Sequence, residues 1–520
     1  MGGIAAVSNG MQLTWDGPAG YYQIYQKSNS LTAPWIALGK ATNLNRIATV
    51  TTLYSNAFFR VAGPAPKYAG YKVCISCHLT VCSYVTNTPH ATAFSNPAFK
   101  AYGGQTNAYC LPCHTVGYGL PTGFSLTNRS GVITYATNLA GVQCENCHGP
   151  AANHAGAEDD ITVRPRVEIA ATLCGGCHTD TYNEWRGSEH GAVTPDALAR
   201  MSQGTNNITS CGACHSGSVR TTLYKGQNPV SLTNDLNVAL SCVVCHDPHQ
   251  TNANPAQLRG PLFSTNDFHL YSTNLASAAA FTNKYYASAN INLCAQCHND
   301  RGAAWTDTAR APHHSVQYNM LMGSIGVMPA GYSTFNPASH AGLPSSAVFS
   351  TNGTFYLTNQ CASCHMPASG DTHNHSFTAS TTVCLNCHQN TSAQTYWSDL
   401  LSNQVSMVVY NLNRWSATKA PASLVSNGVV AWEYTTPGGL TWQTNAAGNV
   451  ISWSLTAPVT FTGPNAAGQS LLLTNYPNIL KARFNLYLYA NDGSGGVHNP
   501  LYMYFMLNNA LTLVSQELNK

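Results

Sequence analysis

The sequence predicts three parts: an all-β module at the N-terminus, a mostly irregular central segment with short α-helices, and an α+β segment at the C-terminus. Three observations support this prediction. Residues 1–66 alternate apolar and polar side chains as strands do, 42 glycines and 26 prolines interrupt the 520-residue chain, and one cysteine-histidine motif recurs through its middle. The expected boundaries are 1–66, 67–394 and 395–520.

The N-terminal segment contains strand-like stretches such as MQLTWD, YYQIYQKS and NAFFRVAG, separated by turns rich in Gly, Asn, Asp and Pro. It has no cysteine and no histidine. We expect a small β-sandwich of the fibronectin type III or immunoglobulin-like kind, followed by the linker GPAPK. Such a module is typical of a spacer or adhesion domain, and a specific role in assembly is the alternative.

The central segment contains nine copies of Cys-x-x-Cys-His, in a chain with 19 cysteines and 20 histidines. Random placement of these residues would give roughly 0.03 copies. Two thiols at this spacing form thioethers with the vinyl groups of one haem, and the adjacent histidine binds the iron. Zinc ribbons, redox-active pairs and disulfide frameworks also use paired cysteines, but none of them requires the following histidine. The sequence therefore predicts nine covalent c-type haems, wrapped by loops and short helices.

The predicted thioether residues are Cys74, Cys77, Cys110, Cys113, Cys144, Cys147, Cys174, Cys177, Cys211, Cys214, Cys242, Cys245, Cys294, Cys297, Cys361, Cys364, Cys384 and Cys387. The predicted proximal iron ligands are His78, His114, His148, His178, His215, His246, His298, His365 and His388. Cys82 lies outside the motifs, and we expect an inert buried thiol or, alternatively, an intersubunit disulfide.

The eleven remaining histidines are candidates for the distal ligands. Nine irons need at most nine, so we expect one ligand from His313 and His314 and one from His373 and His375. Methionine would raise the haem potential, but the histidines suffice, which favours low-potential bis-histidine haems throughout. The predicted distal ligands are His90, His154, His190, His249, His269, His313 or His314, His340, His375 or its neighbour His373, and His498.

Three of these positions restrict the arrangement of the haems. His249 follows His246 by three residues and cannot pass round the same macrocycle, so we expect it to serve a different haem. The same argument applies less tightly to His154, after His148. His498 lies far beyond the last motif, so its ligation requires the C-terminal segment to fold back onto the haems. Ligands donated across motifs hold neighbouring haems close together in a chain.

The C-terminal segment begins with TYWSDLLSNQVSMVVYNLNRW, whose helical periodicity places Leu400, Leu401, Val405, Val408 and Val409 on one side. VVAWEYTTPGGLTWQT and NVISWSLTAPVTF are predicted strands. ILKARFNLYLYA and NPLYMYFMLNNALTLVSQEL are predicted helices on either side of His498, and Pro500 is a favoured first residue for the second.

Residues 70–394 resemble the multihaem c-type cytochromes that include the tetrahaem cytochrome of ammonia oxidation, hydroxylamine oxidoreductase and pentahaem nitrite reductase. Beyond the motifs, the matching stretches are TNTPHATAF, GVQCENCHGPAANH, EWRGSEHG, CHDPH, APHHSVQYNMLMG, ASHAGL, NHSF and DGSGGVHNPLY. The resemblance implies that the histidines in these settings are distal ligands, whereas His269 is included by counting alone. Reductases of the family leave one iron open, in some members with a Lys-terminated motif, and this sequence contains no CxxCK.

Two classes of function follow. The first is electron transport through a nonahaem conduit to other cytochromes, extracellular acceptors or identical subunits, with a head-to-tail filament or a discrete particle as alternatives. Filament-forming extracellular cytochromes resemble such a chain. The second is an oxidoreductase acting on nitrite, hydroxylamine or a sulfur oxyanion at one open-coordinate haem. We favour electron transport and predict no catalytic residue.

Composition bears on partners and location. Charged residues make up 8% of the chain and the net charge is +3, which argues against nucleic-acid binding, and no apolar run is long enough for a transmembrane helix. MGGIAAVSNG lacks the regions of a signal peptide, so we expect any leader to lie outside this numbering. Haem attachment and the charge-poor Ser/Thr/Asn/Gly-rich loops favour an exported protein, extracellular or at the cell surface, with the periplasm as the alternative.

Overall fold

The structure is a computed structural model. It describes residues 3–8, 10–15, 21–29, 32–42, 47–54, 56–63, 66–135, 137–232, 235–250, 254–259, 291–332, 361–369, 372–386, 392–426, 428–436, 440–447, 449–454 and 461–520. The chain forms two compact units. The first unit comprises Met1–Arg186 and Val238–Arg259, and the second comprises Gly187–Asn237 and Gly260–Lys520.

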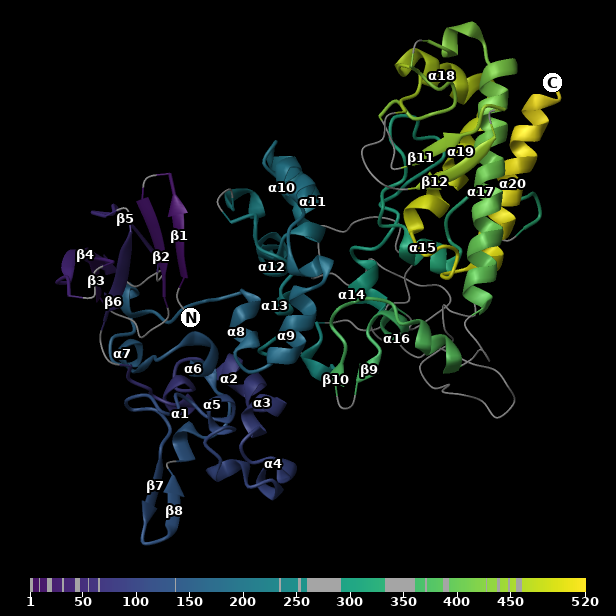
Figure 1. Ribbon diagram of the computed structural model, residues 1–520. Helices are drawn as coiled ribbons and strands as arrows, with labels where there is room; N and C mark the ends of the chain where they lie inside the picture. Colours follow the sequence, from purple (N-terminus) through teal and green to yellow (C-terminus); the bar gives the residue numbers. More distant parts are fainter. Residues whose placement is uncertain are drawn as a thin grey trace. The chain divides into compact units, whose positions relative to one another are not determined.

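The first unit begins with six strands in two antiparallel three-stranded sheets, ordered β1-β2-β5 and β4-β3-β6 (Figure 1). The strands are β1 (Gly3–Val7), β2 (Gly10–Thr14), β3 (Tyr21–Ser28), β4 (Ile36–Thr42), β5 (Ile47–Val50) and β6 (Ala57–Ala62). Leu13 and Ile24 are both 2% exposed and alternate with more exposed neighbours, as strands with one buried face require. The strand-rich N-terminus is confirmed, while the packing of the two sheets as a sandwich stays a prediction.

The rest of the first unit consists of short helices and loops, as expected. The helices are α1 (Tyr71–Cys74), α2 (Leu79–Val85), α3 (Pro89–Thr92), α4 (Pro97–Ala101), α5 (Leu111–His114), α6 (Cys144–His148), α7 (Ala152–Ala155), α8 (Ala171–Gly175), α9 (Thr179–Arg186) and α13 (Cys242–Cys245). β7 (Leu126–Arg129) and β8 (Val132–Tyr135) form a hairpin. Pro89 and Pro97 each begin a helix, where the side chains of Thr88 and Asn96 cap free backbone N–H groups.

The second unit contains two kinds of structure. Its motif-bearing part has short elements: α10 (Pro195–Met201), α11 (Thr205–His215), α12 (Gly217–Tyr224), α14 (Ile291–Ala295), α15 (Gln317–Met322), α16 (Cys361–His365), β9 (Ala368–Ser369) and β10 (Thr372–His373). Its C-terminal part has α17 (Ser392–Thr418), β11 (Thr441–Thr444), β12 (Val450–Ser454), α18 (Ala466–Asn475), α19 (Pro477–Asp492) and α20 (Pro500–Leu518).

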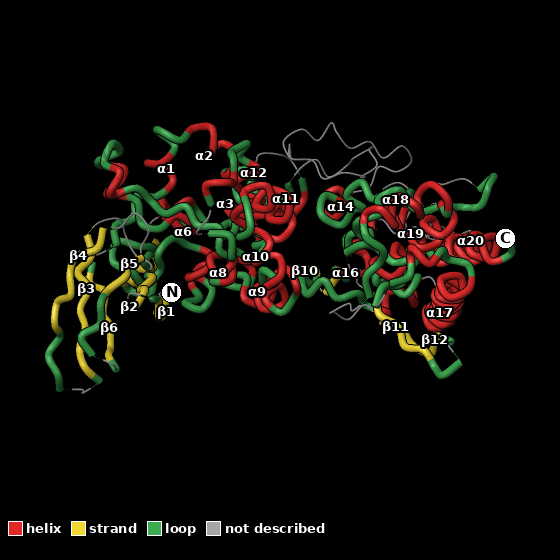
Figure 2. Tube along the Cα trace, turned by 90° about the horizontal axis from the view of Figure 1, so that it is seen from above, coloured by secondary structure: helices red, strands yellow, loops and turns green. Residues whose placement is uncertain are grey.

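The helices α17, α19 and α20 lie side by side in both views of the molecule (Figures 1 and 2). The predicted helix around Leu401 and Val405 is confirmed, since both residues are completely buried within α17. The start of the last helix at Pro500 is confirmed as well. None of the helices in the described chain is both long and apolar enough to span a membrane.

The C-terminal helices contact the segment that follows the seventh motif, within the second unit. The side-chain amide of Asn485 donates to the carbonyl of Val327 at 2.7 Å and accepts from the same residue's N–H at 2.8 Å. The Tyr502 hydroxyl donates to the carbonyl of Ile325 at 2.7 Å. Because these buried contacts satisfy backbone groups of an irregular loop, they fix the loop against α19 and α20.

The predicted strand VVAWEYTTPGGLTWQT is wrong over its first half. Among the described residues of this stretch, only Thr441–Thr444 form a strand, and residues 431–434 lie in turns with every side chain completely buried. A strand with one solvent face would leave alternate residues exposed. Here the Arg483 guanidinium donates to the carbonyls of Trp432 and Glu433, at 3.1 and 2.9 Å, and replaces a strand partner.

Candidate haem-binding sites

The eight motifs that the structure describes in full each form a helical turn. The backbone N–H of the histidine bonds to the carbonyl of the first cysteine four residues earlier, at 2.9 Å for His78, His178, His246 and His298. Residues at i, i+3 and i+4 share one face of a helix. The two thiols and the imidazole of one motif therefore face the same side, as attachment and ligation of one haem require. None of the cysteines in the described ranges forms a disulfide, which is consistent with thioether attachment.

Six motif histidines face a histidine from another part of the chain. The ring centroids are 6.4 Å apart for His78 and His154, 6.0 Å for His90 and His178, 6.1 Å for His148 and His249, 6.2 Å for His190 and His298, 5.9 Å for His215 and His314, and 6.4 Å for His365 and His498. The first three pairs lie in the first unit and the other three in the second.

These separations fit an iron between each pair. A metal–imidazole bond is about 2 Å long and a ring centroid lies about 1.1 Å beyond the bound nitrogen, so opposed axial imidazoles have centroids about 6.2 Å apart. Imidazoles in direct van der Waals contact lie closer, as His313 and His314 do at 4.0 Å. The residues present thus fit haem c, which supplies a one-electron Fe(III)/Fe(II) couple when bound.

The pairing crosses between motifs. His249 follows the motif of His246 but faces His148, with the two ring planes inclined by only 3°. His154 follows the motif of His148 but faces His78. Each of these residues thus lies opposite the histidine of another motif, and its ligation of that motif's haem stays a prediction.

Cysteines of different motifs also contact one another. Hydrogen bonds join the thiols of Cys74 and Cys144, Cys113 and Cys177, Cys174 and Cys242, Cys214 and Cys297, and Cys294 and Cys361. The bond from Cys74 lowers the pKa of Cys144 to about 7, and the bond from Cys174 does the same for Cys242. Attachment points of neighbouring motifs are therefore in direct contact. Cys82 is buried, as expected, and its thiol contacts Cys144.

The adjacent histidines 313 and 314 have different surroundings. His314 faces His215, whereas Nδ1 of His313 lies 2.9 Å from the Ser315 hydroxyl. Burial, together with His215, lowers the pKa of His314 to about 4. Burial, with His298, likewise lowers the pKa of His190 to about 4. Both imidazoles are consequently neutral at physiological pH and keep a lone pair for a metal.

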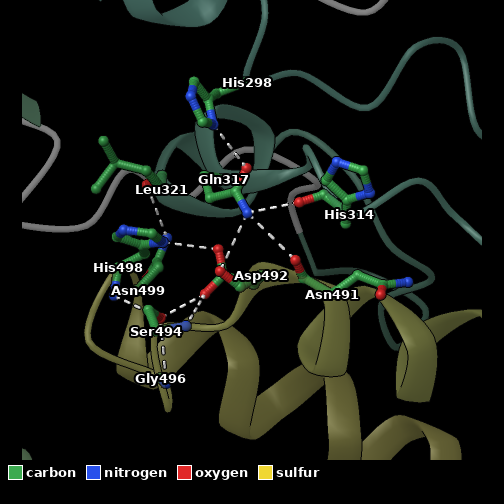
Figure 3. Close-up of polar contacts among 10 residues, drawn as sticks. All are labelled: His298, His314, Gln317, Leu321, Asn491, Asp492, Ser494, Gly496, His498 and Asn499. Carbon is green, nitrogen blue, oxygen red and sulfur yellow. Dashed lines mark hydrogen bonds and ion pairs between the residues drawn. The ribbon is translucent and has the colours of Figure 1, made fainter. Parts of the chain in front are cut away.

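His498 has an anionic partner. Its Nδ1 lies 2.7 Å from Oδ1 of Asp492, whose side chain is completely buried (Figure 3). Burial alone would lower the pKa of His498, but the Asp492 carboxylate outweighs it and the pKa is raised. Sequence analysis missed Asp492. An acidic residue six positions before a candidate ligand, in a chain with only 20 acidic residues, is the signal that was available.

His114 has a different neighbour. Phe99 stacks on the His114 ring with centroids 4.0 Å apart and an interplanar angle of 11°. Nδ1 of His114 lies 3.2 Å from the carbonyl of Ala93. Within the described ranges, no imidazole is among the ring contacts of His114. Sequence analysis missed Phe99, because no spacing rule links an aromatic residue to a motif in the next loop.

The other candidates are placed as follows. Nδ1 of His246 lies 2.7 Å from the carbonyl of Ala256, Nδ1 of His375 lies 2.7 Å from that of His373, and Nδ1 of His373 lies 2.9 Å from that of Met366. His269, His340, Cys387 and His388 lie outside the described residues.

Known proteins are similar to parts of this sequence and to this fold. The family model described as cytochrome c554 and c-prime matches residues 73–149 and 173–247. Cytochrome c-554 of Nitrosomonas europaea is 26% identical over 172 residues, which cover 27% of this chain and 70% of that protein. The multiheme cytochrome MtrA of Shewanella baltica is 26% identical over 159 residues, which cover 27% of this chain and 45% of that protein.

Two solved structures have a similar fold over 87% of this chain. The undecaheme cytochrome from the S-layer of Carboxydothermus ferrireducens has a TM-score of 0.54 at 19% identity, with 70% of that chain covered. The outer cell wall cytochrome OcwA has a TM-score of 0.51 at 17% identity, with 99% of that chain covered.

The repeated motifs, the fold and these relatives define an electron-transferring protein with covalently attached haem. The chain is a multihaem c-type cytochrome, and the resemblance predicted from its sequence is confirmed.

Proposed function

We propose that this protein carries electrons through nine covalently bound c-type haems, most or all of them with two histidine ligands. The observation that carries the proposal is the crossed arrangement of the motifs within each unit. Electron transport over distance needs cofactors close to one another, and here both thiols and imidazoles link different motifs.

In the first unit, five motifs form one connected group. The motif of His78 is linked to the motif of His148 by His154 and by the contact of their thiols. His249 links the motif of His148 to the motif of His246, since it follows one and faces the other. Thiol contacts then join the motif of His178 to those of His246 and His114.

In the second unit, three of the motifs are connected in the same way. His314 follows the motif of His298 and faces His215, and the thiols of these two motifs meet at Cys214 and Cys297. The thiols of Cys294 and Cys361 link the motif of His298 to that of His365. Each unit thus supports a continuous run of haems.

The test combines a haem count with the spin state of the irons. Mass spectrometry of the purified, denatured holoprotein should show nine haems attached to the chain, and electron paramagnetic resonance of the oxidised protein should show low-spin ferric signals for the paired sites. Fewer attached haems, or high-spin iron at the six paired sites, would contradict the proposal.

A second candidate function rests on His114. Phe99 stacks on the His114 imidazole, and no imidazole among the described residues is in ring contact with it, so we infer that its haem has one protein ligand and an open position. Such a haem would suit reduction of nitrite, hydroxylamine or a sulfur oxyanion. A high-spin signal that changes on addition of one of these compounds, and is followed by its turnover, favours this function. A wholly low-spin protein excludes it.

We further propose an exported protein at the cell surface, with other cytochromes, extracellular acceptors or identical subunits as partners. Support comes from the fold shared with an S-layer and an outer cell wall cytochrome and from the low charge of the chain. A sandwich at the N-terminus is supported by Trp15, next to β2, whose ring lies 5.3 Å from that of Tyr22 in the other sheet. Its exposed Ile4 and Phe58 suit a contact with a neighbouring subunit in a filament. Detection of the native protein only in cytoplasmic fractions would contradict this location.

A further inference from the structure

The loop between α19 and α20 places a candidate haem ligand against a carboxylate at the end of α19. Asp492, the last residue of α19, is completely buried at its side chain and lies 2.7 Å from Nδ1 of His498 (Figure 3). The other ring nitrogen of His498 remains for the iron, and its ring faces His365 at 6.4 Å. A carboxylate only accepts hydrogen bonds, so the contact assigns the proton to Nδ1 and leaves the lone pair on Nε2.

The position of Asp492 is fixed from several sides. Its Oδ2 accepts from the hydroxyl and the N–H of Ser494, so both carboxylate oxygens are engaged. Gln317 donates from Nε2 to the carbonyls of Asn491 and Asp492, at 3.2 and 3.3 Å, and to that of His314 at 2.7 Å. Ser494 therefore holds the carboxylate toward His498, while Gln317 holds the backbone of Asp492 next to that of His314.

Other imidazoles at the motifs have neutral partners. Nδ1 of His365, on the opposite side of the same site, lies 2.9 Å from the carbonyl of Phe377. Nδ1 of His148 lies 2.7 Å from the carbonyl of Arg166, and Nδ1 of His298 lies 3.3 Å from Oε1 of Gln317. A neutral oxygen orients the ring, whereas a carboxylate also makes the imidazole a stronger electron donor.

A stronger donor stabilises ferric over ferrous iron and lowers the reduction potential. The buried negative charge of Asp492 acts in the same direction, because reduction adds an electron close to it. We propose that Asp492 is a positioning residue that lowers the reduction potential of the haem bound by Cys361 and Cys364. This inference rests on the proposed ligation of that haem by His365 and His498.

The test is a redox titration of the holoprotein followed by electron paramagnetic resonance. In Asp492→Asn, which replaces the carboxylate by a neutral group of the same shape, one low-spin haem should shift to a higher potential while the other haems keep theirs. His498 still binds the iron, so no high-spin signal should appear. Unchanged potentials in the folded variant would overturn the proposal.

Three further variants make the result unambiguous. Asp492→Ser supplies a smaller neutral acceptor and should give the same upward shift, so the test stands if the asparagine variant does not fold. Asp307→Asn removes the same charge from an exposed residue whose carboxylate accepts from the backbone N–H groups of Ala309 and Arg310, and it should leave every potential unchanged.

The third variant, His498→Ala, tests the ligation itself and should turn one haem high-spin. If it leaves all haems low-spin, the assigned ligand is wrong. If it produces a high-spin haem while both Asp492 variants keep the wild-type potentials, the ligand is right and the role of Asp492 is wrong.

Discussion

The sequence predicts that one of the neighbouring residues His313 and His314 is a haem ligand, and their surroundings favour His314. The ring centroid of His314 lies 5.9 Å from that of His215, and the ring centroid of His313 lies 4.0 Å from that of His314. We expect His314→Ala to convert one low-spin haem to high-spin, because the iron loses an axial nitrogen. His313→Ala should keep every haem low-spin. Electron paramagnetic resonance of the two variants measures this difference, and the opposite pattern would exchange the roles of the two residues.

His249 offers a second comparison at this scale. We expect His249→Ala to turn the haem of Cys144 and Cys147 high-spin, because His249 faces His148. The haem of Cys242 and Cys245, next to His249 in the chain, should keep its spin state. An experimental structure of the variant would identify the altered iron, and a vacant position on the haem of His246 would contradict the pairing.

The sequence could predict the motifs but only part of their surroundings. Cys-x-x-Cys-His is local, so its chemistry follows from spacing. The choice between His313 and His314 is set by distant residues such as His215, to which no local pattern refers. The same holds for Phe99 on His114 and for Asp492 on His498, where the partner is brought close by a loop.

Among the elements, α17 was predictable because its buried side follows the helical period. We expect Leu401→Ala to lower the free energy of unfolding of the C-terminal part by roughly 2–5 kcal/mol, since Leu401 is completely buried. Met407→Ala, on the same helix but 52% exposed, should change it by less than about 0.5 kcal/mol. Denaturant unfolding followed by circular dichroism compares the two. Equal effects would contradict the packing of α17.

The turn at residues 431–434 was not predictable, because its pattern of side chains suits a strand. Its burial depends on contacts with α19, which lies far away in the sequence. Burial raises the pKa of Glu433 to about 7. Folded Glu433 thus keeps a proton that the unfolded chain releases above about pH 4.3. The free energy of unfolding therefore decreases as the pH rises from there toward 7. Glu433→Gln should remove that loss, and its stability relative to the wild type should increase between pH 5 and pH 7.

The control for this pH dependence is Glu158→Gln, at an exposed carboxylate. Its unfolding free energy should follow the wild-type pH profile, measured by denaturant unfolding at each pH. Parallel profiles for Glu433→Gln and the wild type would show that Glu433 ionises normally in the folded protein.

At the scale of the whole molecule, the N-terminal sheets are candidates for contacts between subunits. The N-terminal sheets have strand edges at β1, β5, β4 and β6, which can pair with another chain. If they join subunits, negative-stain microscopy of the native protein should show filaments, and removal of residues 1–63 should leave discrete particles with unchanged haem spectra. Uniform particles from the full chain at every concentration and salt would support a discrete conduit.

The paired histidines would also cross-link the chain through the irons that we propose they bind. With an iron between His365 and His498, a loop of roughly 130 residues is closed, and the pair His90 and His178 closes one of nearly 90. Each closure removes conformations from the unfolded chain, as a disulfide does, and long loops gain most. A central segment of helices mostly four to eight residues long has few other means of holding its shape. Its folding is therefore expected to be completed by the irons, and a reagent that displaces one distal imidazole should loosen a stretch of chain far longer than the motif it touches.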